Sequence, residues 1–330
     1  MRTALALLAA GLLLAVPARA EGTTGAKADA DGERGAHCVA MDWKAPLLRD
    51  HPLAGCSFDG QGRPVAMDAI TDAVAAADYV LLGETHDNGD HHALQGALTR
   101  LVGRDARASG SLVLEMVPRS LQPVLDAPEP ISTLGDRLQW AERGWPQWGE
   151  NAPTIAGAIS QGRALVAGDL DRDDIRRFGM GGDVTEEERA QLRLDGELPP
   201  AQAAQLAEEL KASHCGMLPD TMIAPMATMQ RARDGALAAA MREADRPAVL
   251  LAGRGHVRRD RGVPALLDAP SIAIAFMEVR EGAETARDYE LTGPDGAPLY
   301  DFVVFTPAAE RGDPCAGLRE RFGKKGSGDE

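Results

Sequence analysis

The chain has 330 residues, and 44% of them are hydrophobic, which is enough to bury a large core in one or two domains. Its 50 acidic residues outnumber the 35 basic ones, and the formal net charge of −15 argues against nucleic acid and anionic membrane surfaces as partners. Only 13 residues are aromatic, so we expect Ala, Leu, Val, Ile and Met to fill the core.

Residues 1–20 have the features of a secretory signal peptide. Arg2 precedes an apolar stretch over 4–16, and the small-x-small sequence Ala-Arg-Ala ends at Ala20. The apolar stretch is shorter than the roughly 20 residues of a membrane span. No cysteine follows the expected cut to accept a lipid. We therefore expect an exported protein, periplasmic in a Gram-negative bacterium, with a net charge of −17 because cleavage removes two arginines.

The four cysteines are an even number, which in an oxidising compartment predicts two disulfides. Three pairings exist, and the simplest joins Cys38 to Cys56 and Cys215 to Cys315. Their spacing resembles no zinc motif, so we expect a structural role.

Polar, Gly-rich sequence without periodicity flanks a long central region. It predicts a disordered linker over 21–36 and a disordered tail over 323–330, around a single domain at 37–322. Within that domain, 120–245 reads as a mainly helical insertion that one strand at 164–170 interrupts.

Short apolar runs bounded by polar turns predict the strands of the domain. The first four are apolar at nearly every position, as buried parallel strands are, and helical segments separate them. We expect an α/β fold with a mostly parallel central sheet flanked by helices, and a helical subdomain covering the carboxyl ends of the strands. The runs are 78–84, 111–117, 164–170, 248–256, 272–279 and 301–306.

The first helix after a predicted strand should begin near Asp87 or Asn88 and continue through the sequence HHALQGALTRLV. His91 lies three residues before Leu94 and so shares the apolar face of this helix. His92 does not, and we expect it to be a solvated helix residue.

Acidic and imidazole side chains fall at the ends of four predicted parallel strands. Ligands bind beyond the carboxyl ends of such strands, so we expect these side chains to meet. Imidazole and carboxylate suit zinc, manganese, cobalt or iron, a bound metal activates water, and a spare carboxylate acts as general base. The residues are Glu84, His86, Glu115, Asp169 and His256.

Each candidate also has a structural interpretation. Glu84 could cap the helix that follows it, Asp169 could be a strand-end cap, and His214, beside Cys215, fits a structural role better than a ligand role. The methionines of 216–229, Met226 among them, are either core material or the lining of an apolar cofactor pocket. Gln230, Arg233 and Asp234 fit a polar helix face, although Arg233 could pair with an acid of the site.

No phosphate loop, dinucleotide fingerprint, Gly-x-Ser-x-Gly elbow or Cys-His nucleophile pair is present in the sequence. The ordered combination VLLGETHDNGDHH, VLEM, GDL, HCGMLP with MATMQRARDGALA, and LLAGRGHVRRDRGVP resembles the ChaN family of haem-binding uptake proteins over about 65–285. That family lies in a superfamily with Tiki and TraB proteins and, more distantly, the erythromycin esterases.

The resemblance implies haem binding and iron acquisition at the cell envelope, with an envelope transport partner or a homodimer as further expectations. His86, His91, His256, Met226 and Arg233 are then the candidate haem-binding residues. The family is linked with tyrosine ligation of haem iron, but the three tyrosines of this chain lie outside the quoted motifs, so the iron ligand stays open.

Tiki-like relatives imply instead a divalent-metal-dependent hydrolase that uses Mn, Co or Zn. Its metal ligands would be Glu84, His86, Glu115 and His256, and Glu84 and Glu115 would be its catalytic carboxylates. Our leading hypothesis is the haem or iron binder, and the metallohydrolase is the alternative.

Overall fold

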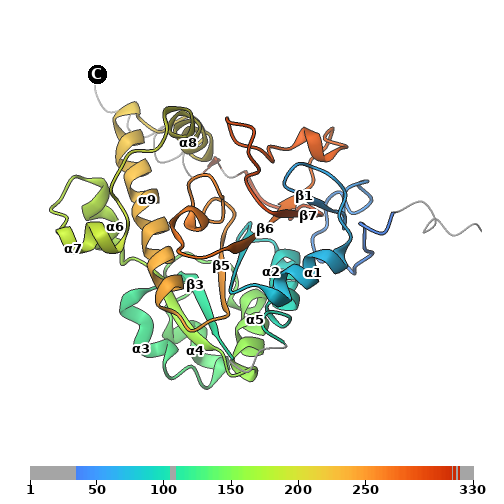
Figure 1. The fold of residues 1–330 in the computed structure, drawn as a ribbon, viewed down its shortest axis with the longest axis horizontal. Helices are drawn as coiled ribbons and strands as arrows, with labels where there is room; N and C mark the ends of the chain where they lie inside the picture. The colour runs from blue at the N-terminus through green and yellow to red at the C-terminus, as the bar shows by residue number, and fades with distance from the viewer. Residues whose placement is uncertain (1–34, 105–108, 314, 317–318, 320–330) are drawn as a thin grey trace, which may run out of the picture. The chain divides into compact units, whose positions relative to one another are not determined.

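A computed structural model describes residues 35–104, 109–313, 315–316 and 319 (Figure 1). The predicted signal peptide, the linker up to residue 34 and the predicted tail lie outside the described residues. No helix in the described part of the chain is both long and apolar enough to cross a membrane.

The centre of the domain is one seven-stranded sheet with the order β1-β7-β6-β2-β5-β3-β4. All neighbouring pairs are parallel except β1 with β7, as expected for a mostly parallel α/β fold. The strands are β1 (Ser57–Asp59), β2 (Tyr79–Glu84), β3 (Ser111–Pro118), β4 (Ala164–Asp169), β5 (Ala248–Gly253), β6 (Ser271–Glu278) and β7 (Phe302–Thr306).

Six of these strands match the predicted apolar runs, and β1 was not predicted. The run 248–256 ends as a strand at Gly253, so His256 lies in the following turn. Strands β2 and β5 lie in the middle of the sheet and are almost completely buried, which explains why they are apolar throughout.

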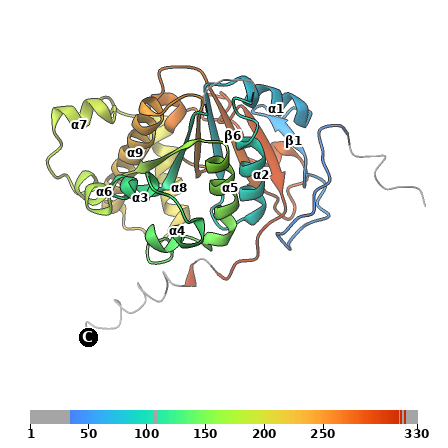
Figure 2. The ribbon, with the colours of Figure 1, turned by 90° about the horizontal axis from the view of Figure 1, so that it is seen from below.

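Helices cover both faces of the sheet (Figure 2). On one face, apolar residues of α1, α2, α4 and α5 pack against the strands, and on the other the alanine-rich second half of α9 does so. The helices are α1 (Met67–Ala76), α2 (Gly89–Thr99), α3 (Gln122–Leu125), α4 (Ile131–Arg137), α5 (Trp148–Ser160), α6 (Arg172–Gly179), α7 (Glu186–Gln191), α8 (Pro200–Ser213) and α9 (Asp220–Glu243). Short 3-10 turns are η2 (Arg119–Leu121), η3 (Val263–Leu266) and η4 (Ala286–Asp288).

Helix α2 begins where the sequence predicted it. The side chain of Asn88 accepts hydrogen bonds from the amides of Asp90 and His91, which satisfies donors that have no partner within the helix. This cap turns the chain sharply after β2 and brings the first turn of α2 back over the end of that strand.

Helix α9 is the longest element of the helical cover. Its second half is buried against β3, β4 and β5, whereas its first half packs against α8 and carries methionines that are partly exposed (Figure 1). The helix therefore connects the sheet to the cover above the carboxyl ends of the strands.

Two disulfides are present, and they are the simplest of the three pairings. Cys38 is bonded to Cys56, and Cys215 is bonded to Cys315 across a sequence separation of 100 residues. The first lies beside the edge strand β1, and the second fixes the turn between α8 and α9 to the C-terminal segment.

Candidate functional site

The strand ends bring together eight polar residues that we call the strand-end cluster. Glu84 and Asp169 are the last residues of β2 and β4, and Glu115 lies within β3 close to its end. The loop after β2, helices α2 and α9 and the turn after β5 supply the other members. The cluster consists of Glu84, His86, His92, Glu115, Asp169, Arg233, Asp234 and His256.

His86 lies between two buried carboxylates. Its Nδ1 is 2.8 Å from Oε1 of Glu84, and its Nε2 is 3.6 Å from Oε2 of Glu115. The side chain keeps 30% of its surface exposed and packs edge-on against the indole of Trp145, 4.9 Å between ring centroids. His86 is therefore the most accessible histidine of the cluster, although both of its nitrogens face carboxylates.

Arg233 joins two strands through their acids. Its guanidinium donates to Glu115 Oε1 at 2.7 Å and to Asp169 Oδ2 at 2.6 Å. The sequence left two interpretations of Arg233 open, and the structure shows the one in which it pairs with acids of the site. A fixed cation thus lies between the two carboxylates.

His256 is buried between two further carboxylates. Its Nδ1 is 2.6 Å from Oδ1 of Asp234, and its Nε2 is 3.2 Å from Oε1 of Glu115. The amide nitrogen of Gln230, one turn before Asp234 on α9, is 3.1 Å from the same Nδ1. Neither ring nitrogen of His256 is left without an acid.

The close packing of the cluster has a backbone cause at Gly253. The amide of Gly253 donates to Oε2 of Glu115 at 2.6 Å. A Cβ atom at position 253 would lie 2.9 Å from Nε2 of His86, so any other residue would displace the imidazole. The glycine at the end of β5 lets His86 approach Glu115.

Ion pairing within the cluster lowers the pKa values of Glu84 and Glu115. Burial would raise the pKa of Glu84, but the hydrogen bond from His86 and the neighbouring His92 lower it to about 2. Burial would likewise raise the pKa of Glu115, but His256, His86 and Arg233 hold it well below its ordinary value.

The same ion pairs raise the pKa values of His256 and His86. Burial would lower the pKa of His256, but Glu115 and Asp234 raise it to about 10. The pKa of His86 is also raised, because Glu115 and Glu84 outweigh the effect of burial. At neutral pH the ring of His256 is therefore an imidazolium cation within a network of ion pairs, and the pKa of His86 is shifted in the same direction.

The expectation that His92 is solvated is wrong. His92 is buried, and its Nε2 lies 3.1 Å from Oε2 of Glu84 without the alignment of a hydrogen bond, so the contact is electrostatic. The reason is that α5 packs against α2 and covers its second face, where Thr154 donates to the carbonyl of His92.

His91 does not join the cluster. Its Nδ1 accepts from the amide of Thr85 at 2.9 Å, and its Nε2 is 2.8 Å from the hydroxyl of Thr306. Burial lowers the pKa of His91 to about 3, so the ring is neutral. It connects β2, α2 and β7, which is a structural arrangement.

The four residues expected to bind a divalent metal are neighbours, but they do not surround a common point. They form a chain in which Glu84 contacts His86, His86 contacts Glu115, and Glu115 contacts His256. Within the described residues, the one trio of His, Cys, Asp or Glu donors whose atoms lie within 4.8 Å of each other is His37 with the disulfide-bonded Cys38 and Cys56. Most donors of the cluster contact one another, whereas Oε2 of Glu84 and both ring nitrogens of His92 have no hydrogen-bond partner among the described residues.

Met226 lies outside the cluster but on the same face of α9. Residues four apart on a helix are neighbours, so Met222, Met226 and Gln230 form one row that leads to the cluster. Met222 and Met226 are partly exposed. This row is consistent with the lining of an apolar pocket, the second of the two interpretations of these methionines.

A cavity of about 360 Å³ adjoins the cluster at the ends of β3 and β4. Trp145 and Asp169 lie on its wall, and each also contacts a member of the cluster. Arg143 on the same wall donates only to main-chain carbonyls, those of Met116 and Leu138.

Sequence reasoning gave no site role to His92, Asp234 or Trp145. Asp234 had been assigned to an ordinary polar helix face, and Trp145 belongs to a loop without periodicity. The usable signal was the spacing of Gln230, Arg233 and Asp234, which places all three near one line on α9. No comparable signal in the sequence relates Trp145 to His86.

The sequence model described as haem-binding uptake, Tiki superfamily, ChaN matches residues 70–267, more than half of the chain. The chain belongs to the ChaN family. The matched residues include every member of the strand-end cluster and both helices α8 and α9. No curated relative matches the chain.

One solved structure agrees with this family assignment at the level of the fold. The chain is similar to ChaN of Campylobacter jejuni, described for its cofacial haem binding, with a TM-score of 0.58 and 17% identity over 75% of this chain and 94% of that one. The type III effector HopBA1 shares 15% identity over 82% of this chain and 99% of that one, with a TM-score of 0.41. A mutant erythromycin esterase in its open conformation shares 15% identity over 88% of both chains, with a TM-score of 0.32.

Proposed function

We propose that this ChaN-family protein binds haem as cargo and serves iron uptake in the periplasm of the bacterial cell. The observation that supports this best is the row of Met222 and Met226 on the exposed part of α9, within the residues that match the family. Thioether side chains are apolar and polarisable, adapt to flat ligands, and occur beside haem and as its ligands.

The strand-end cluster does not support the divalent-metal hydrolase to the same degree. A divalent ion would have to displace Arg233 from Glu115 or the imidazolium of His256 from its two acids, because these groups are already paired. Breaking such buried pairs is costly unless the ion replaces every contact. The network is better suited to fixing the strand ends beneath the helical cover.

Titration of the purified protein with hemin, followed by Soret absorbance, tests the proposed function. We expect a saturable shift near one haem per chain or per pair of chains. His86→Ala and His256→Ala should retain the shift if they fold, because their nitrogens face acids. A protein that leaves the hemin spectrum unchanged at micromolar concentrations would contradict haem binding.

The uptake role and the location need separate measurements. A strain without the protein should grow more slowly than its parent when haem is the iron source, and equally well on a ferrous salt. Osmotic shock should release the protein with periplasmic markers, as the two disulfides lead us to expect. Equal growth on haem would contradict the uptake role, and recovery with cytoplasmic markers would contradict the location.

A further inference from the structure

The three tyrosine side chains of this chain are too deeply buried to reach a haem iron. Tyr79, Tyr289 and Tyr300 expose 0%, 8% and 3% of their surface. The hydroxyl of Tyr289 accepts from the amide of Arg280, and the ring of Tyr79 lies beneath the guanidinium of Arg246. A phenolate ligand would require the core to open.

Most of the histidine side chains are likewise buried or already paired with other groups. His86 and His256 face carboxylates with both ring nitrogens, His91 is hydrogen bonded at both, and His92 is buried beside Glu84. His51 is 9% exposed, and its Nδ1 accepts from a backbone amide. Of the seven histidines of the chain, His37 and His214 are the two that are partly exposed and have no acid among their described contacts.

His214 has the geometry of a metal-binding histidine. It ends helix α8, and its Nδ1 lies 2.8 Å from the carbonyl oxygen of Leu210. A carbonyl can only accept, so Nδ1 donates its proton and the lone pair of the neutral ring is on Nε2. Histidines that bind metals commonly donate their other ring nitrogen to a carbonyl in this way, which fixes the orientation of the ring.

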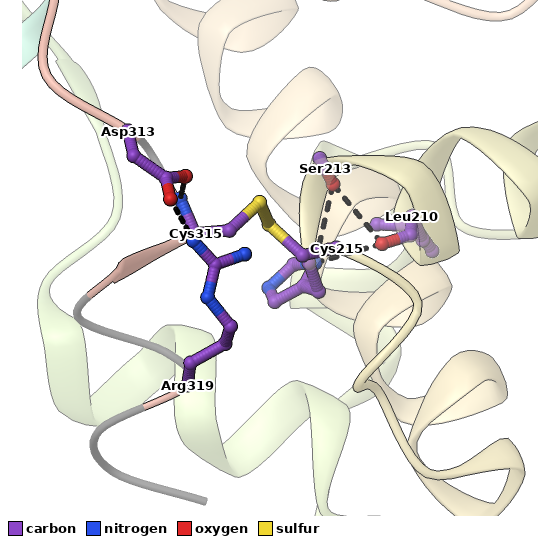
Figure 3. The surroundings of a disulfide bond; sticks show 7 residues. Leu210, Ser213, Cys215, Asp313, Cys315 and Arg319 are labelled. Carbon is purple, nitrogen blue, oxygen red and sulfur yellow. Dashed lines mark hydrogen bonds and ion pairs between the residues drawn. A yellow bond between two sulfur atoms is a disulfide. The ribbon is translucent and has the colours of Figure 1, made fainter.

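The turn around His214 is held firmly. Its neighbour Cys215 is bonded to Cys315, and Ser213 and Leu210 lie beside this disulfide on α8 (Figure 3). The hydroxyl of Ser213 is 3.1 Å from Nδ1 of His214. The disulfide holds the turn that carries His214 in place at the end of α8.

Methionines occur in the same turn and on the helix that follows it. Met217 donates its amide to the carbonyl of His214 at 3.0 Å, and α8 packs against α9, whose first half carries Met222 and Met226 and lies beside α8 in Figure 1. A porphyrin bound at His214 would therefore have thioether groups available on the adjacent helix. His37 lacks this setting, because its ring packs against Phe58 and it lies outside the residues that match the family.

We propose that Nε2 of His214 binds the iron of haem, with the methionines of the α8–α9 turn in contact with the porphyrin. This inference rests on the proposed function, since it assigns the iron ligand of the haem that the protein carries. It also assigns a role to the disulfide Cys215–Cys315, because this bond would hold in place the turn that carries the iron ligand.

The test compares hemin titrations of the wild type, His214→Ala, His214→Gln and the matched control His37→Ala. We expect His214→Ala and His214→Gln to bind hemin at least tenfold more weakly and to lose the spectrum of histidine-ligated haem. The glutamine can still donate to the Leu210 carbonyl, so it covers the case in which the alanine variant folds poorly. His37→Ala should match the wild type.

Ligand replacement gives a second readout. Added imidazole should restore the wild-type Soret position in His214→Ala, and His214→Tyr should show the visible charge-transfer band of phenolate-ligated ferric haem. Wild-type affinity and spectrum in both His214→Ala and His214→Gln, or their loss in His37→Ala, would overturn the assignment while haem binding itself stands. No spectral change in the wild type would refute haem binding and, with it, the assignment.

Discussion

The strand-end cluster and the turn between α8 and α9 (214–219) differ in how many of their potential metal-binding atoms already have a hydrogen-bond or ion-pair partner. In the cluster, carboxylates, imidazoles and a guanidinium satisfy one another in a buried network. At the turn, one imidazole keeps a nitrogen available at the surface. The comparison shows that residues of metal-ligand type can gather in one place and still be paired mainly with one another, so the partners of each donor have to be considered together with its residue type.

Removing Arg233 should have the largest effect. Arg233→Ala leaves Glu115 and Asp169 buried without their cation, so we expect the free energy of unfolding to fall by about 3 kcal/mol or more in chemical denaturation. Arg63→Ala is the control, because the Arg63–Asp59 pair is exposed and should contribute at most about 1 kcal/mol. Equal losses in the two variants would contradict the view of the cluster as a stabilising network.

The pH dependence of stability should report the same network. The folded-state pKa of His256 is about 10 and its ordinary value is 6.5, so its stabilisation is complete below pH 6.5 and is lost as the pH rises towards 10. The unfolding free energy of the wild type should fall across this window. In His256→Gln the decline should be shallower, although the variant is less stable throughout. An unchanged slope would show that His256 is not held as a cation.

Substitution of Met226 should have a smaller effect, confined to haem binding. Met226→Gln replaces a partly exposed thioether by an amide of similar length, and we expect about fivefold weaker hemin binding, or about 1 kcal/mol, with little change in Tm. Met180→Gln is the control, because Met180 follows the end of α6 and is 61% exposed, so its side chain makes few contacts in the described structure. The prediction fails if both variants bind hemin as the wild type does.

Divalent ions should have the smallest effect. Because most donors of the cluster already contact one another, we expect added Mn, Co or Zn to leave the Tm unchanged within error, and chelation to leave it unchanged as well. A saturable rise of the Tm with one of these ions, absent in Glu115→Gln, would restore the metal-dependent hydrolase as the better proposal.

Much of the fold could be predicted from the sequence because buried parallel strands are apolar at nearly every position. This is why β2, β3, β4 and β5 were predicted close to their true limits. Strand β1 has three residues and forms only because the edge of β7 accepts a partner, so no local pattern marks it.

The site was predictable in part, because residues at the ends of parallel strands must share one edge of the sheet. Glu84, Glu115, Asp169 and His256 meet for this reason. The closure of the network depends on contacts that the spacing does not reveal, such as α5 covering His92 and Trp145 reaching His86. His214 begins the segment HCGMLP, but this pattern does not distinguish its two nitrogens, and only the hydrogen bond to Leu210 does so.

The bond between Cys215 and Cys315 also limits when and where the covalent structure of the chain can be completed. Cys315 follows β7, so the bond can close only after every strand of the sheet has been synthesised. It can close only where thiols become oxidised. The bond that fixes the turn carrying His214 therefore forms only after residue 315 has been synthesised, and under the proposed function haem would meet that fixed turn only in an oxidising compartment.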